Sequence, residues 1–321
     1  MIVYHKGSLM VQKYIKNQNG KNPFLDTLAQ LPTKVGKKDL KNLQKRARSK
    51  WFTQGITLSL VDLKSPLTKY YWSAYHCNTH IEQQGLQLKS RYCNTRTCHI
   101  CNRIRTAKMM NGYLAQLSGR SLEFVTLTIP NVSAEQLSAT VDDLIKTTTK
   151  IMRVFRERRN ISINGIRKIE ITYNPDKNTY HPHIHLIVDQ AGQLIVYEWL
   201  KRYPKANKKA QDCRPADQSS LNELFKYSTK IVGHKEGNFV VYASALDNIM
   251  LALRNKRCFQ PFGDIRKVSE EVSEELEGEE YDIQEQTFMV WTWKECDWLN
   301  TERDTLTGYI SPDVDFVYLY T

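Results

Sequence analysis

Histidines at alternate positions set the strongest limit on how this chain can fold. His181, His183 and His185 alternate with apolar residues and then run into an apolar tail. Because successive side chains of a β-strand point to opposite faces, a strand here carries the imidazoles on one face and the apolar residues on the core face. Pro182 has no N–H for a sheet ladder, so we expect it where the strand begins or at a sheet edge. Imidazoles grouped in this way are typical of metal ligands or catalytic groups, whereas a single histidine is more often an ordinary packed residue.

A carboxylate is expected beside these imidazoles. Residues 166–173 have the composition of a strand, and residues 174–178 (NPDKN) are turn formers. A hairpin closed by this turn places Glu170 roughly opposite His183. One glutamate and two neutral imidazoles form a mixed nitrogen and oxygen site that suits Mn²⁺ or Mg²⁺. The alternative interpretation of Glu170 is an exposed carboxylate on a strand.

The segments before the hairpin indicate the fold class. Residues 122–129 read as a strand, and Ser133 can cap a following helix with Gln136 as its reciprocal partner. An apolar stripe at helical spacing continues to about Arg159. Together with the hairpin this gives the order β-α-β-β, which predicts an α+β fold with an antiparallel sheet and helices on its faces.

Cysteines upstream of this region have the spacing Cys-x15-Cys-x4-Cys-x2-Cys. In a cytoplasmic chain such thiols bind metal more often than they form disulfides, so the pattern predicts a closed tetrahedral zinc site. The ligands would be Cys77, Cys93, Cys98 and Cys101. A nearby histidine (His76, His80 or His99) could replace one cysteine, and a cluster of free thiols is the alternative.

Charge points to a polyanionic partner. The chain carries a net charge of +12, but residues 261–321 contain 4 Lys and Arg against 16 Asp and Glu, so residues 1–260 carry +24. This favours nucleic acid, although a solvated basic surface would have the same charge. A helix expected at residues 37–52 has one basic face with the same two explanations. The candidate DNA contacts around the cysteines are Arg91, Arg96, Arg103, Arg105 and Lys108.

The compartment follows from what the sequence lacks. We find no apolar run of membrane-spanning length and no hydrophobic region of a signal peptide at the start of the chain. We therefore expect a cytoplasmic protein without membrane contact.

A second informative stretch, residues 219–232, reads as a helix with an apolar face. On that helix Glu223, Tyr227 and Lys230 would share the opposite face at positions i, i+4 and i+7. A carboxylate, a phenol and an ammonium would then be presented together. Taken alone, an ordinary surface helix explains the pattern equally well.

Three segments, in this order, resemble the motifs of rolling-circle replication initiators of Gram-positive-type plasmids. These initiators are HUH endonucleases, named for the His-hydrophobe-His motif. The segments are residues 122–132 (LEFVTLTIPNV), 180–188 (YHPHIHLIV) and 223–230 (ELFKYSTK). The upstream cysteine cluster is also similar to that of the family, and the resemblance covers roughly residues 70–255. It implies an HUH fold with a ferredoxin- or RRM-like core, here with an N-terminal zinc-stapled region.

The resemblance assigns the catalytic metal ligands. His183 and His185 match the family's metal-binding pair. His181, just outside that pair, would be either a further ligand or a residue that contacts the ligands without binding the metal. Glu170 is our candidate for the third ligand. The bound ion would be Mn²⁺ or Mg²⁺, and the cysteine site would hold structural Zn²⁺.

The resemblance also assigns the chemistry. Tyr227 matches the nucleophile and Lys230 its accompanying lysine. Glu223 lies where one subgroup has a glutamate in place of a second catalytic tyrosine. The implied activity is nicking of origin DNA by transesterification, with a 5′-phosphotyrosyl adduct and a free 3′-OH, and glutamate-assisted hydrolysis at termination. The implied partners are single-stranded or extruded origin DNA, a host helicase and, in a homodimer, a second copy of the chain.

The expected domain organisation has four parts. A chain of 321 residues can form two or three folded domains with linking segments. The parts are a basic arm and helix (1–70), a zinc-binding region (71–115), an HUH endonuclease domain (116–260) and an acidic linker with a small C-terminal module (261–321).

Three other functions fit parts of the sequence. The histidine segment also matches the histidine-triad pattern of small nucleotide hydrolases, but that fold explains neither the cysteines nor the charge. A zinc-dependent DNA-binding regulator without catalysis is a second alternative. A relaxase or transposase would use the same chemistry, although most relaxases have the tyrosine early in the chain.

Overall fold

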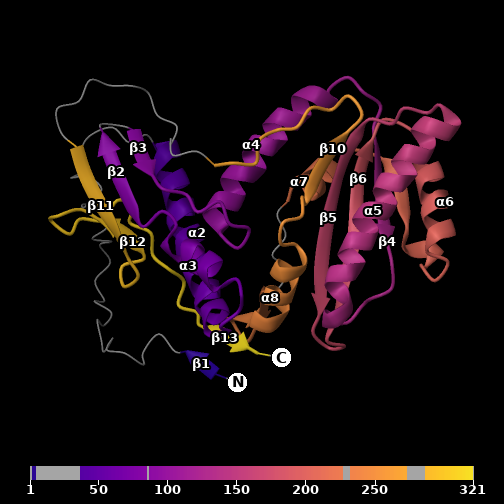
Figure 1. Ribbon diagram of the computed structural model, residues 1–321. Helices are drawn as coiled ribbons and strands as arrows, with labels where there is room; N and C mark the ends of the chain where they lie inside the picture. The colour runs from indigo at the N-terminus through magenta and orange to yellow at the C-terminus, as the bar shows by residue number, and fades with distance from the viewer. Residues whose placement is uncertain (1, 5–36, 85–86, 227–231, 273–285, 321) are drawn as a thin grey trace. The chain divides into compact units, whose positions relative to one another are not determined.

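The computed structural model describes residues 2–4, 37–84, 87–226, 232–272 and 286–320 (Figure 1). It divides into two compact units, each built from separate stretches of the chain. Unit 1 comprises residues 1–102, 234–241 and 271–319, and unit 2 comprises residues 103–233, 242–270 and 320–321. The four-part organisation expected from the sequence stays a prediction.

Unit 2 is built on a five-stranded sheet with the order β10-β5-β6-β4-β7, in which every neighbouring pair is antiparallel. The predicted α+β fold with an antiparallel sheet is therefore confirmed. The central hairpin is the one expected from the alternating histidines and the NPDKN turn. The strands are β4 (Glu123–Thr128), β5 (Gly165–Asn174), β6 (Thr179–Val188), β7 (Asp212–Pro215) and β10 (Phe259–Phe262).

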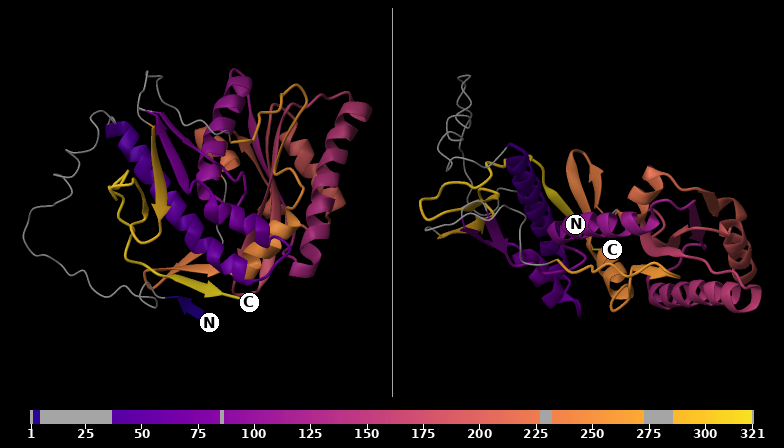
Figure 2. Two further views of the ribbon diagram at one scale, coloured as in Figure 1. Left: turned by 60° about the vertical axis from the view of Figure 1, so that its left-hand side comes forward. Right: turned by 90° about the horizontal axis from the view of Figure 1, so that it is seen from above.

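Helices α5 (Ala134–Arg159) and α6 (Gly192–Arg202) pack on this sheet and on each other. Both views of Figure 2 show α5 along one side of the sheet. The predicted capping box is present at its start, where the Ser133 N–H donates to Gln136 Oε1 at 3.3 Å. The apolar stripe of α5 is buried, as are Pro182, Ile184 and Leu186, which alternate with the histidines. The core therefore lies on the face opposite the imidazoles.

Helix α7 (Gln218–Phe225) is shorter than the helix predicted for residues 219–232. Lys226 is extended (φ −64°, ψ 117°), and Val232 already begins strand β8. The prediction of one continuous helix over residues 219–232 is therefore wrong. The last turn of the helix is held by packing, because the buried Phe225 ring stacks on the rings of Tyr113 and Phe259. Tyr227 and Lys230 themselves lie outside the described residues.

Unit 1 contains long helix α2 (Lys37–Asp62) and helix α3 (Thr68–His76). Helix α2 extends beyond the predicted residues 37–52. In this extension Gly55 packs closely against the Phe316 ring, because a Cβ added at Gly55 would lie 2.3 Å from the ring. Two four-stranded sheets have the orders β12-β11-β2-β3 and β1-β13-β9-β8. Their strands are β1 (Ile2–Tyr4), β2 (His80–Gln84), β3 (Gln87–Ser90), β8 (Val232–Lys235), β9 (Asn238–Tyr242), β11 (Gln286–Thr292), β12 (Asp297–Leu299) and β13 (Phe316–Leu319).

The other helices in the described residues are α4 (His99–Leu117), α8 (Ala243–Ala252) and the 3-10 turn η1 (Lys208–Ala210). Among the residues that the structure describes, no helix combines the length and the apolar character needed to cross a membrane.

Candidate active site

The β5–β6 hairpin brings the predicted metal ligands together. Its register pairs Glu170 with His183, as expected from the turn, and pairs Lys168 with His185. One ligand atom from each of Glu170, His183 and His185 lies within 4.8 Å of the other two. All three residues are buried, with exposed fractions of 5%, 8% and 7%. His185 Nε2 is 3.7 Å from Glu170 Oε2.

The second nitrogen of each imidazole is held by a neighbour. His183 Nδ1 is 3.1 Å from the carbonyl oxygen of His181, and His185 Nδ1 is 3.1 Å from Thr126 Oγ1 on β4. The His185 ring also stacks on Phe124. Groups that hold Nδ1 fix the ring orientation and leave Nε2 available for a ligand. Two imidazole nitrogens and a carboxylate oxygen in this arrangement could hold a divalent cation.

His181 lies beside this group. Its ring stacks on the His183 ring with centroids 5.2 Å apart. Burial, and then the neighbouring His183, lowers the pKa of His181, which favours its neutral form. Both predicted roles of His181, as a metal ligand or as a residue that contacts the ligands, stay predictions.

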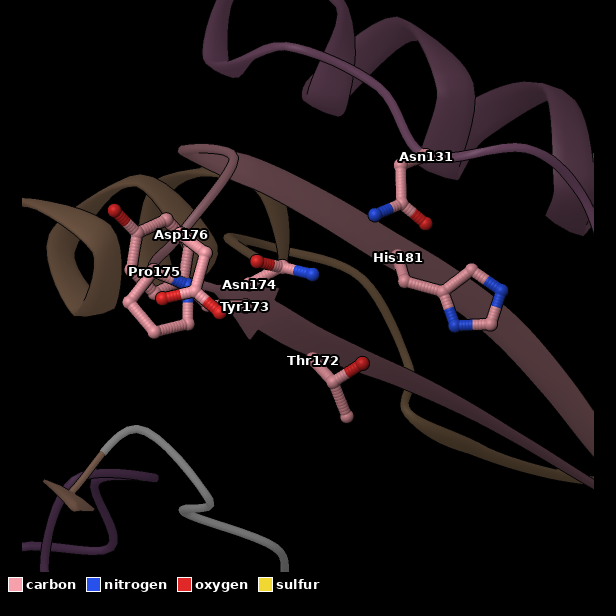
Figure 3. A pocket seen from close by; sticks show the side chains of 7 residues that line it. All are labelled: Asn131, Thr172, Tyr173, Asn174, Pro175, Asp176 and His181. Atoms are coloured by element: carbon pink, nitrogen blue, oxygen red, sulfur yellow. The ribbon is translucent and has the colours of Figure 1, made fainter.

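A polar cavity of about 350 Å³ opens next to the histidine face, and Figure 3 shows its lining. His181 and Thr172 line it from paired positions of the two strands of the hairpin. Asn131 lines it from the loop after β4, and its side-chain amide donates to Thr179 Oγ1. The cavity thus offers amide, hydroxyl and imidazole groups beside the candidate metal site.

The sequence analysis missed Lys168 as a member of this site. Lys168 lies on β5 two residues before Glu170, so both side chains point to the same face. Lys168 Nζ donates to Glu170 Oε2 at 2.7 Å. It also donates to the backbone carbonyl oxygens of Glu223 and Lys226, at 3.0 and 2.9 Å. The hairpin register that selected Glu170 also places Lys168 opposite His185, so the same signal could have found Lys168.

Glu223 lies in the last turn of α7 and is half-buried. Its carbonyl oxygen is anchored by Lys168, as described above. The other predicted members of the tyrosine motif, Tyr227 and Lys230, fall outside the described residues. Their catalytic roles stay predictions.

The cysteine cluster in unit 1 has the geometry of a metal site. Ligand atoms of Cys77, Cys93, Cys98 and Cys101 lie within 4.8 Å of one another. Cys101 Sγ is 3.6 Å from Cys77 Sγ and 3.7 Å from Cys93 Sγ. Four sulfurs placed about 2.3 Å from a tetrahedral zinc ion are about 3.8 Å apart, so the cluster fits zinc. All four cysteines are free thiols.

A buried ammonium lies against this cluster. Lys50 Nζ donates to the carbonyl oxygens of Tyr75 and Cys77, at 2.8 and 2.6 Å, and to Thr79 Oγ1 at 3.0 Å. Burial lowers the pKa of Lys50 to about 8, while Cys77 and the other thiols act in the opposite direction. A positive charge here would offset the negative charge of thiolates that hold a metal.

The predicted DNA contacts differ in exposure. Arg91, Arg103 and Lys108 are exposed, and Arg96 is half-buried. Arg105 is only 4% exposed and donates from Nε to the carbonyl oxygen of Glu270 at 2.9 Å. Its guanidinium is therefore buried and hydrogen-bonded inside unit 2, which makes Arg105 a poor candidate for a DNA contact.

Comparisons with known proteins agree with the sequence resemblance. Residues 85–191 match the family model described as replication protein. A Rep protein of Streptococcus pneumoniae serotype 2 is 33% identical over 116 residues, which are 33% of this chain and 36% of the relative. A Rep protein of Staphylococcus aureus is 27% identical over 184 residues, 48% of this chain and 79% of the relative.

Another Rep protein, from Lactiplantibacillus plantarum, is 26% identical over 216 residues, 56% of this chain and 66% of the relative. The alignments thus span between about one third and four fifths of these relatives. No solved structure matches significantly.

Proposed function

We propose that this chain, whose residues 85–191 match the family model described as replication protein, starts plasmid replication by nicking origin DNA and later rejoining it. One observation carries the proposal: Glu170, His183 and His185 form a buried ligand group directly beside the end of α7, the helix that precedes Tyr227. In the proposed reaction the Tyr227 oxygen forms a bond to phosphorus while the bond to the 3′ oxygen breaks. The products are a 5′-phosphotyrosyl adduct and a free 3′-OH that can prime synthesis.

The donor set supports a catalytic Mn²⁺ or Mg²⁺ held by Glu170, His183 and His185, with His181 nearby. Such an ion, when bound, polarises the scissile phosphate and stabilises the leaving oxygen. A phenol has an ordinary pKa of about 10, so Tyr227 needs help to lose its proton. We assign that help to the Lys230 ammonium, which would stabilise the phenolate.

Termination is assigned to Glu223. A half-buried carboxylate in the last turn of α7 could accept a proton from water that attacks the regenerated site. Hydrolysis would then end replication without a second protein–DNA adduct. This role requires Glu223 and Tyr227 to act on the same phosphate.

The remaining parts supply DNA binding. The polar cavity beside His181 could receive a nucleotide that flanks the scissile phosphate, and the exposed Arg91, Arg103 and Lys108 could follow the backbone of single-stranded or extruded DNA. We assign structural Zn²⁺ to the four cysteines. The proposal places the reaction in the cytoplasm, with a host helicase to unwind the plasmid and a homodimer as a possible assembly.

The test is incubation of the full chain with a labelled single-stranded origin oligonucleotide and Mn²⁺, followed by mapping of the DNA-linked peptide. We expect an adduct on Tyr227 that is absent in Tyr227→Phe and in EDTA. Tyr197→Phe, which changes an exposed tyrosine of α6, is the matched control and should keep the adduct. DNA binding that persists in EDTA without any adduct would favour the non-catalytic regulator instead.

A further inference from the structure

Lys168 is a buried lysine whose three acceptors come from two different parts of unit 2. Its side chain is only 5% exposed, and Nζ lies 2.7 to 3.0 Å from each acceptor. An ammonium group has three N–H donors, so these contacts use all of them. A buried charge needs such complete pairing because its removal from water is costly.

The acceptors join the candidate metal site to the end of α7. One acceptor is Oε2 of Glu170, the same oxygen that lies 3.7 Å from His185 Nε2. The other two are carbonyl oxygens at the C-terminus of α7, where the helix has left its last carbonyls without backbone partners. A positive charge is favoured at this end of a helix dipole. Lys226, whose carbonyl oxygen accepts one of these bonds, is the residue directly before Tyr227.

Packing alone already holds the body of α7. Phe225 is buried between Tyr113 and Phe259, with ring centroids 5.6 and 6.0 Å away. Loss of the Lys168 contacts should therefore loosen the last residues of α7 without unfolding the helix. The lysine fixes where the chain leaves the helix, and the aromatic rings fix the helix itself.

We propose that Lys168 is a positioning residue that holds the exit of α7 against the metal-binding carboxylate. This inference rests on the proposed nicking function, since it gives Lys168 the task of directing the chain toward the scissile phosphate. Lys168 acts through Glu170 and the backbone of α7. Its ammonium would also compete electrostatically with a cation held by the Glu170 carboxylate.

The test compares Lys168→Met, which keeps the length of the side chain and removes the charge, with Lys168→Arg. In Lys168→Met we expect Mn²⁺ to bind about tenfold more tightly, because the competing ammonium is gone. We expect single-turnover adduct formation to fall about a hundredfold, because the exit of α7 is no longer aligned. Amides of residues 222–226 should exchange hydrogen faster, while those of β5 and β6 stay protected. Lys168→Arg should restore part of the rate.

A merely structural role would lower Mn²⁺ affinity, adduct rate and protection throughout unit 2 together. Lys201→Met, at an exposed lysine of α6, is the matched control and should change none of these. If Lys168→Met misfolds, the double variant Lys168→Met with Glu170→Gln also removes the unpaired carboxylate. Hydrogen exchange of amides 222–226 in this double variant then tests whether Lys168 holds the end of α7. An adduct rate equal to wild type, or unchanged exchange at these residues, would overturn the proposal. If the wild-type chain forms no adduct, the nicking function fails. Mn²⁺ affinity and hydrogen exchange of amides 222–226 still test whether Lys168 connects Glu170 to the end of α7.

Discussion

Thr126 Oγ1 lies 3.1 Å from Nδ1 of His185, across the ladder that joins β4 to β6. This contact fixes the orientation of an imidazole whose other nitrogen faces Glu170. Thr126→Val keeps the shape of the side chain but removes the contact. We expect the Mn²⁺ affinity to fall about tenfold, which is the usual cost of losing a partner behind a metal ligand. Isothermal titration of the purified chain measures it.

Thr140→Val is the matched control for that variant. Thr140 is half-buried on α5, and its hydroxyl donates to the carbonyl oxygen of Gln136 four residues earlier. This change should leave Mn²⁺ affinity at the wild-type value. Equal affinities for Thr126→Val and Thr140→Val would mean that Thr126 does not orient His185.

Glu170→Gln should affect both metal binding and stability. The amide offers a weaker ligand, so we expect most Mn²⁺ binding to be lost. The Lys168 ammonium also loses its buried carboxylate partner, and breaking such a pair costs about 3 kcal/mol of unfolding free energy. Urea denaturation without metal measures the loss of unfolding free energy.

The double variant Lys168→Met with Glu170→Gln separates these contributions. Removal of both charges should recover much of the lost stability, because no unpaired charge stays buried. Stability losses of the two single variants that simply add would show that the pair is not coupled in the folded state.

The sequence predicted what depends on local pattern. The register that pairs Glu170 with His183 follows from one short turn and from the alternation of two adjacent strands. The end of α7 does not, because it depends on residues that are distant in the chain. Phe225 packs against Tyr113 and Phe259, and Lys168 donates to carbonyl oxygens at the end of the helix. Burial of Arg105 was missed for the same reason, since its partner is a carbonyl 165 residues away.

The exposed basic residues of α4 should carry part of the DNA affinity. Arg103→Ala with Lys108→Ala removes two exposed charges, whereas Lys146→Ala with Lys150→Ala makes the same change on α5. If each of the α4 residues contacts one phosphate, the slope of log affinity against log salt for single-stranded DNA should fall by about 1.4. Fluorescence anisotropy at several salt concentrations measures the slope. An equal loss in both pairs would indicate a general charge effect without a defined contact.

Zinc should be required for the folding of unit 1. Cys101 is fully buried, and the ring of neighbouring His99 packs edge-on against Phe52, so it is not placed to replace a lost thiolate. Structural zinc contributes about 10 kcal/mol or more to small metal-bound domains, which is comparable to the whole stability of a typical domain. We therefore expect Cys101→Ser to lose zinc by elemental analysis and to lose the near-ultraviolet circular dichroism of the buried tryptophans of unit 1. Cys296→Ser, at a buried thiol outside the cluster, should keep both signals, since a serine hydroxyl can also donate to the Trp293 carbonyl oxygen. A folded Cys101→Ser chain without zinc would show that the cysteines form an ordinary part of the core.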